Sequence, residues 1–147
     1  MTASDDSATT LVVRKVIPVP RQKVFDAWLD PASIARWMRP GDVVHSTAEV
    51  DARVGGKFRI VMSHGKGDGD HWGEYLLIDR PSLLKFTWIS ANTDLRPTEV
   101  TVEFIERGRN TEIVLTHRRV PPDKLTAHLH GWTDIVERLG TTLTSSV

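Results

Sequence analysis

The chain has 147 residues, which is enough for one domain with a substantial core. Its 19 basic and 19 acidic side chains cancel, so no overall charge attracts it to nucleic acid or to an anionic membrane surface. The lack of cysteine excludes disulfides and thiolate chemistry. No apolar run approaches the roughly 20 residues of a membrane-spanning helix, and the polar N-terminus is unlike a signal peptide. We therefore expect a cytoplasmic protein.

The N-terminal part predicts one strand followed by two short helices. Residues 11–17 are mostly β-branched and apolar, which is typical of a strand. Residues 21–29 carry apolar side chains at helical spacing. Asp30 and Pro31 then supply an N-cap and a proline at the first helical position, so a second short helix begins there and stops at Pro40.

The middle of the chain predicts an antiparallel meander. Apolar and polar residues alternate in segments joined by short turns, which is the pattern of strands with one buried face. The segment 63–70 contains three glycines and is expected to be a mobile hairpin loop, able to act as a lid. The predicted strands cover residues 43–50, 57–62, 72–78, 84–89, 100–104 and 112–117.

The segment from Pro121 to Leu143 predicts a long final helix. Its apolar residues recur at intervals of three and four, which places them on one face, and Pro122 suits the first turn. Such a face has to be buried against the sheet. We therefore predict an α+β domain, a curved antiparallel sheet of about seven strands around this helix, with a cavity between them. The apolar stripe consists of Leu125, Leu129, Trp132, Ile135, Val136, Leu139 and Leu143.

Several short motifs, in this order, resemble the START-like (SRPBCC) superfamily and, within it, the homologues of the activator of the heat-shock-protein-ninety ATPase. The resemblance covers residues 11–143 and implies a helix-grip fold with a hydrophobic cavity under the last helix. The superfamily includes lipid carriers, cyclases, hydrolases, hormone receptors and a co-chaperone domain, so it leaves the function open. The motifs are Val24–Trp28, Asp30-Pro31 before Trp37-Met38, Gly55–Phe58, Gly73–Tyr75, Pro81 before Leu84–Trp88, Leu115–His117 and Gly131-Trp132.

On this basis we expect residues 1–9 to be a disordered tail and residues 10–147 to form a single START-like domain. The expected ligand is an apolar or aromatic small molecule, because most inward positions are apolar. The alternative is that these side chains simply fill the core. The candidate ligand-binding residues are Trp28, Trp37, Phe58, Ile60, Tyr75, Phe86, Trp88, His117, His128 and Trp132.

Two histidines are the polar groups expected to face the cavity. His117 ends the last strand and His128 lies one turn before Trp132, so either could orient a ligand or transfer a proton. The alternative for each is a structural hydrogen bond. With Tyr75 they are weak catalytic candidates. Gly131 is costly inside a helix, which predicts a close approach to the backbone or tight packing on a strand.

Metal and cofactor sites are not expected. His64, Asp68, Asp70 and His71 fit neither a calcium loop nor a helical zinc site. The glycines of the same segment lie between strands rather than before a helix, unlike a phosphate loop. Arg59 and Glu74 lie on neighbouring predicted strands and could form a cross-strand pair. Facing inward they would be catalytic candidates, but strand parity favours the outward face, most clearly for Arg59.

The leading hypothesis is a binding module rather than an enzyme, since no catalytic constellation is evident. One alternative is a cyclase or hydrolase that acts in the same cavity. Another is a co-chaperone-like regulator of an ATPase, although nothing in the matching motifs corresponds to the extra N-terminal domain of the eukaryotic co-chaperone. A homodimer through an exposed strand edge is compatible with the pattern.

Overall fold

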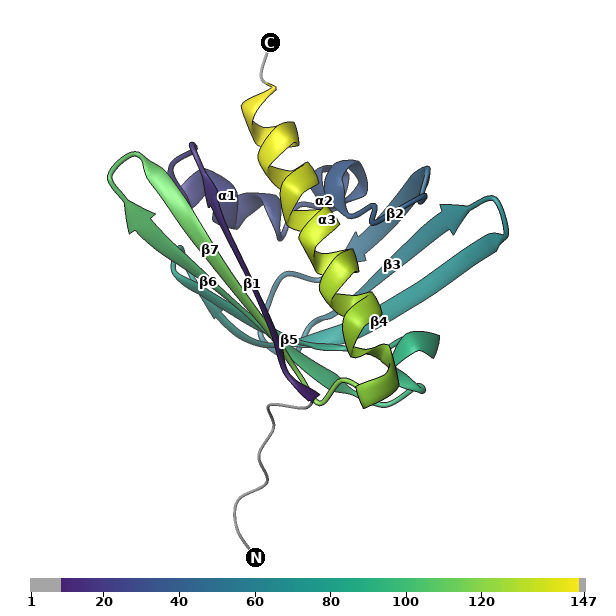
Figure 1. The fold of residues 1–147 in the computed structure, drawn as a ribbon. Coiled ribbons are helices and arrows are strands. Elements are labelled where there is room, and N and C mark those ends of the chain that lie inside the picture. The colour runs from purple at the N-terminus through teal and green to yellow at the C-terminus, as the bar shows by residue number, and fades with distance from the viewer. Residues whose placement is uncertain (1–8, 146–147) are drawn as a thin grey trace, which may run out of the picture.

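A computed structural model describes residues 9–145 of the chain. Within them, seven antiparallel strands form one sheet in the order β1-β7-β6-β5-β4-β3-β2. The long helix α3 crosses the concave face of this sheet (Figure 1), which confirms the predicted α+β architecture. The strands are β1 (Leu11–Ile17), β2 (His45–Val50), β3 (Lys57–His64), β4 (Gly67–Asp79), β5 (Leu83–Trp88), β6 (Thr98–Arg107) and β7 (Asn110–Arg118).

Two short helices and two 3₁₀ turns complete the described fold. The helices α1 (Arg21–Ala27) and α2 (Pro31–Trp37) follow β1 directly. Asp30 caps α2 by accepting a hydrogen bond from the N–H of Ala32 at 3.1 Å, as its sequence position predicts. The remaining elements are the 3₁₀ turns η2 (Ala91–Thr93) and η3 (Pro122–Lys124) and the helix α3 (Leu125–Thr144).

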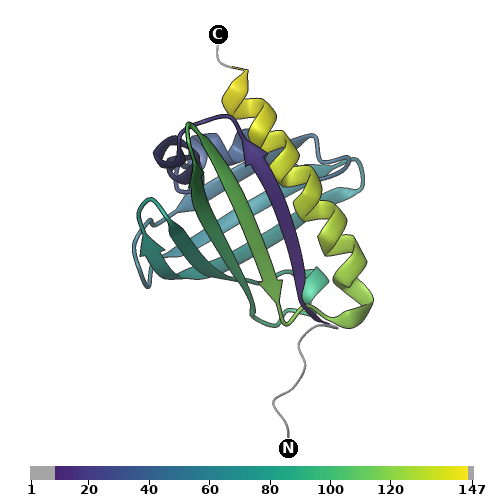
Figure 2. The same cartoon turned by 60° about the vertical axis from the view of Figure 1, so that its left-hand side comes forward.

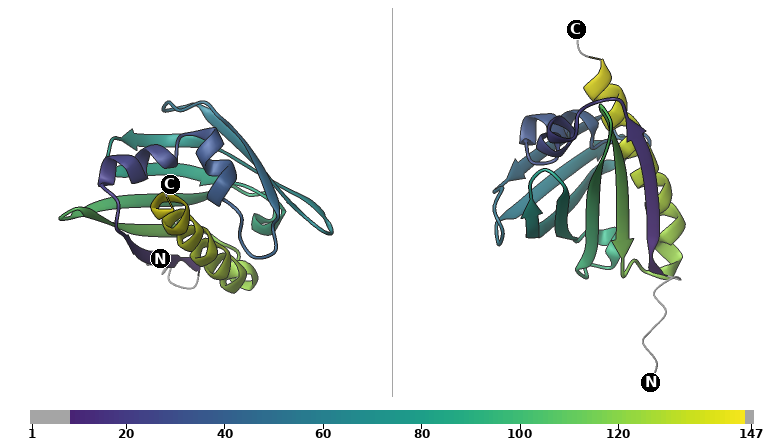
Figure 3. Two further views of the ribbon diagram at one scale, coloured as in Figure 1. Left: turned by 90° about the horizontal axis from the view of Figure 1, so that it is seen from above. Right: turned by 90° about the vertical axis from the view of Figure 1, so that its left-hand side faces the viewer.

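All three α-helices pack on the concave side of the sheet, which Figures 2 and 3 show from other directions. The ring of Phe25 in α1 meets Phe104 of β6 edge-on, with 5.0 Å between centroids. Trp28, just after α1, lies 6.5 Å from Trp132 of α3. The core therefore forms between the sheet and all three helices, because each contributes its apolar side to one cluster.

The apolar stripe of α3 is buried only from Trp132 onward. Trp132, Ile135, Val136 and Leu139 are buried, whereas Leu129 is 38% exposed. The expectation that Leu129 faces the sheet was therefore wrong. The turn that contains Leu129 runs beside an open cavity instead of the packed core, since residues 127, 128, 130 and 131 border that cavity.

The predicted loop at residues 63–70 is mostly strand. β3 extends to His64 and β4 begins at Gly67, which pairs with His64, so only two residues form the turn. The glycines permit this tight hairpin, and Gly67 has a φ of +127°. A mobile lid at this place is therefore not what the structure shows.

The expected ion pair between Arg59 and Glu74 was also wrong. Glu74 lies opposite Lys57, while Arg59 faces Trp72 and reaches diagonally to Asp70. Arg59 Nη2 and Asp70 Oδ2 are 2.9 Å apart on the outward face. The outward position of Arg59 agrees with the alternation of its strand, because Phe58 and Ile60 are buried.

The expected tail falls largely on residues 1–8, which lie outside the described residues. Thr9 is described, and its carbonyl accepts a hydrogen bond from the N–H of Val120 at 3.0 Å. The chain is thus attached to the fold from Thr9 onward. No helix of the described part is long and apolar enough to cross a membrane.

Candidate functional site

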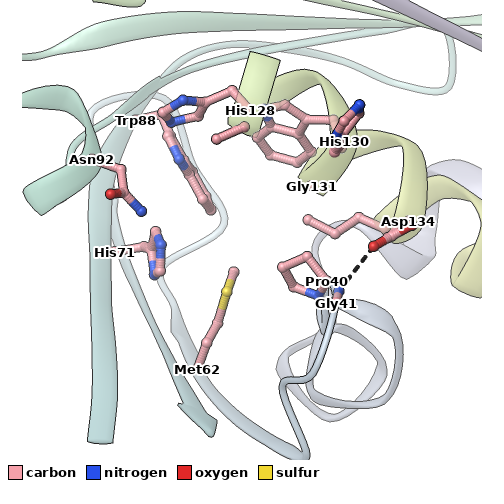
Figure 4. Close-up of a pocket in the computed structure, with 13 residues that line it drawn as sticks. Pro40, Gly41, Met62, His71, Trp88, Asn92, His128, His130, Gly131 and Asp134 are labelled. Carbon is pink, nitrogen blue, oxygen red and sulfur yellow. Dashed lines mark hydrogen bonds between the residues drawn. The ribbon is translucent and has the colours of Figure 1, made fainter. Parts of the chain in front are cut away.

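An open cavity of about 300 Å³ lies between the first half of α3 and the inner face of β3–β5. The segment after α2 closes another side with Pro40 and Gly41, as Figure 4 shows. The volume of the cavity is at the lower end of the range of small-molecule sites. The lining residues are Pro40, Gly41, Met62, His71, Trp88, Asn92, Ala127, His128, His130, Gly131, Trp132, Asp134 and Ile135.

The walls of the cavity are largely aromatic and aliphatic. The indole rings of Trp88 and Trp132 lie 5.0 Å apart and are tilted by 54°. Met62, Pro40 and Ile135 complete the apolar surface around them. Because these side chains come from the sheet, from α3 and from the segment after α2, the cavity depends on the tertiary fold. Such a surface suits the flat face of a ring.

Two imidazoles provide polar atoms on this apolar surface. The His71 ring lies 5.1 Å from the Trp88 ring. Burial lowers the pKa of His71, although the carbonyls of Gly69 and Ile60 oppose this change. Burial also lowers the pKa of His128, whose Nδ1 donates a hydrogen bond to the carbonyl of Lys124 at 2.9 Å. Both imidazoles are therefore neutral at pH 7.

A buried chain of hydrogen bonds holds α3 on the sheet beside the cavity. The indole Nε1–H of Trp132 donates to Nδ1 of His117 at 2.9 Å. Nε2 of His117 lies 2.7 Å from the hydroxyl of Thr98, which in turn donates to the carbonyl of Trp88 at 2.6 Å. The chain thus connects α3 to β7, β6 and β5.

This arrangement determines the protonation of His117. An indole N–H can only donate, so Nδ1 must accept and the proton of the neutral ring is on Nε2. The ring is 0% exposed. Burial and the nearby His128 lower the pKa of His117 to about 3. With both nitrogens occupied, His117 has a structural hydrogen-bonding role, which is the alternative that the sequence left open.

The segment that borders the cavity after α2 is attached to α3 by its backbone. The carboxylate of Asp134 accepts a hydrogen bond from the N–H of Gly41 at 2.9 Å, drawn as a dashed line in Figure 4. Arg138 donates to the carbonyl of Gly41 at 3.4 Å. Gly41 has a φ of +58°, which glycine adopts without strain. These contacts fix the distance between Pro40 and α3, and hence the width of the cavity.

Most of the predicted ligand-binding aromatics pack against one another instead of lining this cavity. Trp28 is the centre of the group: its ring lies 4.7 Å from Trp37 and 6.5 Å from Phe86. The space left among these rings is about 20 Å³, enough for roughly one water molecule. That small space is lined by Trp28, Phe58, Ile60, Tyr75, Phe86 and Trp88 together with Ile34 and Met38.

The structure therefore divides the ten candidate residues. Trp88, His128 and Trp132 line the open cavity. Trp37 and His117 are fully buried and line neither space, with Trp37 donating from Nε1 to the hydroxyl of Ser33. Whether any of them binds a ligand stays a prediction.

Sequence reasoning missed several residues of the cavity wall. His71 could have been found, because it has the same strand parity as the inward-facing Gly73 and Tyr75. Asn92 and Gly41 carry no such signal, since they reach the cavity from irregular segments. The prediction of a close approach to Gly131 or of tight packing on a strand was wrong, because a Cβ there would meet only Pro40, at 3.8 Å.

The chain was compared with known protein families. A family model described as "Activator of Hsp90 ATPase homolog 1-like protein" matches residues 18–144, which is most of the chain. The chain belongs to this family. A search of the curated proteins found no match.

Solved structures related to the chain share the helix-grip fold of this family. A protein from Plasmodium falciparum, described as an HSP90 activator, is 27% identical, covers 92% of this chain and 96% of its own, and has a TM-score of 0.75. CalU16 from Micromonospora echinospora is 23% identical, with coverages of 92% and 76% and a TM-score of 0.72. A protein from Arthrobacter aurescens is 20% identical, with coverages of 99% and 91% and a TM-score of 0.83.

We predict that His117 makes the protein less stable in mild acid. The pKa of His117 is about 3 in the folded protein and has its ordinary value of 6.5 in the unfolded chain. Below pH 6.5 the unfolded chain therefore binds a proton at this histidine that the folded protein does not bind. Between about pH 6 and pH 4 this removes about 1.4 kcal/mol of stability per pH unit. Urea unfolding of the wild type and of His117→Asn at several pH values measures it. Asparagine keeps an acceptor for Trp132 but does not titrate. The free energy of unfolding should therefore change less steeply with pH in His117→Asn than in the wild type, by about one proton. Equal slopes would contradict the assignment.

Proposed function

We propose that this protein is a binding module for a small aromatic or apolar molecule, held in the open cavity beside α3. The observation that carries the proposal is the composition of the cavity wall, where Trp88 and Trp132 face the same space as Met62 and Ile135. Burying a ring against two indoles removes apolar surface from water, which is worth about 25 cal/mol per Å².

Catalysis is the less supported alternative. A cyclase or hydrolase needs an acid and a base that reach the substrate. Of the three weak catalytic candidates, only His128 borders the open cavity. His117 has both nitrogens in hydrogen bonds, and burial together with the charge of Asp51 raises the pKa of Tyr75. We therefore favour binding without turnover.

A co-chaperone-like role is the second candidate. The observation that favours it is the 27% identity to the HSP90 activator of Plasmodium falciparum over 92% of this chain. Such a role would use the outer surface of the domain and not the cavity. A cytoplasmic location and a homodimer remain proposals that rest on the sequence.

We predict that filling the cavity weakens ligand binding while leaving the fold intact. Gly131 borders the cavity, so the side chain of Gly131→Leu occupies the space where the ring would lie. Gly131→Ala is the matched control, because its Cβ makes only an ordinary contact with Pro40 and stabilises the helix by about 1 kcal/mol.

The measurement is a screen of one-ring and two-ring aromatic compounds by proton–nitrogen correlation NMR, following the indole signals of Trp88 and Trp132. Wild type and Gly131→Ala should bind the same compounds, and Gly131→Leu should bind them at least about tenfold more weakly, a difference of about 1.4 kcal/mol. Equal binding by all three proteins would place the ligand elsewhere and overturn the proposal.

The ATPase rate of a purified Hsp90 separates the two candidate functions. If the chain is only a small-molecule binding module, adding it at equimolar concentration leaves the rate unchanged. A rate increase that Gly131→Leu reproduces would establish the co-chaperone-like role on the outer surface, because that variant has lost only the cavity.

A further inference from the structure

The hydrogen-bonding state of the cavity wall limits which aromatic ligand fits it. In His128, Nδ1 faces the carbonyl of Lys124, and a carbonyl can only accept. The proton of the neutral ring is therefore on Nδ1, and Nε2 carries a lone pair. Among the described residues nothing donates to this Nε2, and it is not sealed from solvent. Nε2 of His128 is thus a hydrogen-bond acceptor to which no group of the described chain donates.

His71 provides a second imidazole in the wall. Its Nδ1 is buried without a hydrogen-bond partner within the described chain, close to the backbone of its own sheet. Its Nε2, by contrast, is accessible. Figure 4 shows His71 and Asn92 on one wall of the cavity, with Trp88 between them and His128. The polar atoms of the wall therefore lie next to the face of an indole.

The remaining polar side chains of the wall are those of Asn92, His130 and Asp134, and the carboxamide of Asn92 offers a donor as well as an acceptor. The carboxylate of Asp134 accepts from Gly41 and belongs to the segment attachment. His130 also lines the cavity and is exposed to solvent. At His128 a ligand therefore meets an apolar surface and a neutral imidazole acceptor. An anionic group would be repelled by the lone pair on Nε2 of His128 and would also lose its hydration, and both effects oppose binding.

We infer that the cavity selects an aromatic ligand with a neutral hydroxyl group, whose O–H donates to Nε2 of His128 while its ring lies against Trp88 and Trp132. This inference rests on the proposed binding function and adds the chemical class of the ligand. The hydroxyl supplies the donor that Nε2 of His128 lacks, and the ring uses the apolar surface. A buried hydroxyl without a partner is unfavourable, so His128 should dominate the selection.

The test compares β-naphthol with β-methylnaphthalene, which has the same shape without the donor, and with β-naphthoate, which is anionic. Dissociation constants at pH 7 are measured by NMR titration for the wild type, His128→Phe and His45→Phe. His45 is exposed on β2 and does not border the cavity, so it controls for the substitution itself.

We expect the wild-type preference for naphthol over methylnaphthalene to fall about tenfold or more in His128→Phe and to be unchanged in His45→Phe. Methylnaphthalene should bind His128→Phe as well as it binds the wild type, which shows that the variant is folded. In the wild type, the Nε2 signal of His128 should shift with naphthol alone.

Two results would overturn the inference and leave the proposed function standing: the same preference in all three proteins, or tighter binding of naphthoate than of naphthol. If none of the three compounds bound any of the proteins, the proposed function would fail together with the inference.

Discussion

The fold and its cavity depend on one buried contact, the hydrogen bond from the indole of Trp132 to Nδ1 of His117. It lies where α3 meets the sheet, and Thr98 continues it to the backbone of β5. Apolar packing alone would allow the helix to slide by small steps, because it is non-directional. A buried indole and imidazole without partners would each be costly, so this contact specifies one position of α3.

The position of α3 explains why the domain has a packed core on one side of Trp132 and a cavity on the other. From Trp132 to Leu139 the helix covers the aromatic group around Trp28, where almost no space remains. Toward its N-terminus the helix carries small or polar residues, including Ala127 and Gly131, which leave space above Met62 and His71. The cavity width is then set by the attachment of Gly41 to Asp134 and Arg138.

Much of the fold could be predicted because local patterns and tertiary packing agree. The alternation around Phe58 and Ile60, the cap at Asp30 and the spacing in α3 each specify an element without knowledge of its neighbours. Prediction failed where contacts between separate elements determine the structure. The three glycines of the β3–β4 hairpin indicate a loop by composition, but strand pairing extends through them. Leu129 fits the apolar stripe, yet it is 38% exposed in the structure. The candidate site was harder still, since it depends on Pro40, His71 and Asn92 meeting from separate elements.

Membership of the Activator of Hsp90 ATPase homolog 1-like family accounts for the architecture, and histidines supply polar atoms to the wall of the cavity. The central claim is that His117 is a neutral acceptor for Trp132, and nitrogen-15 NMR of histidine-labelled protein at pH 7 tests it most directly. The account predicts a protonated Nε2, an unprotonated Nδ1 and a coupling through the hydrogen bond to the indole nitrogen of Trp132. A charged ring, or a neutral ring with its proton on Nδ1, would contradict it.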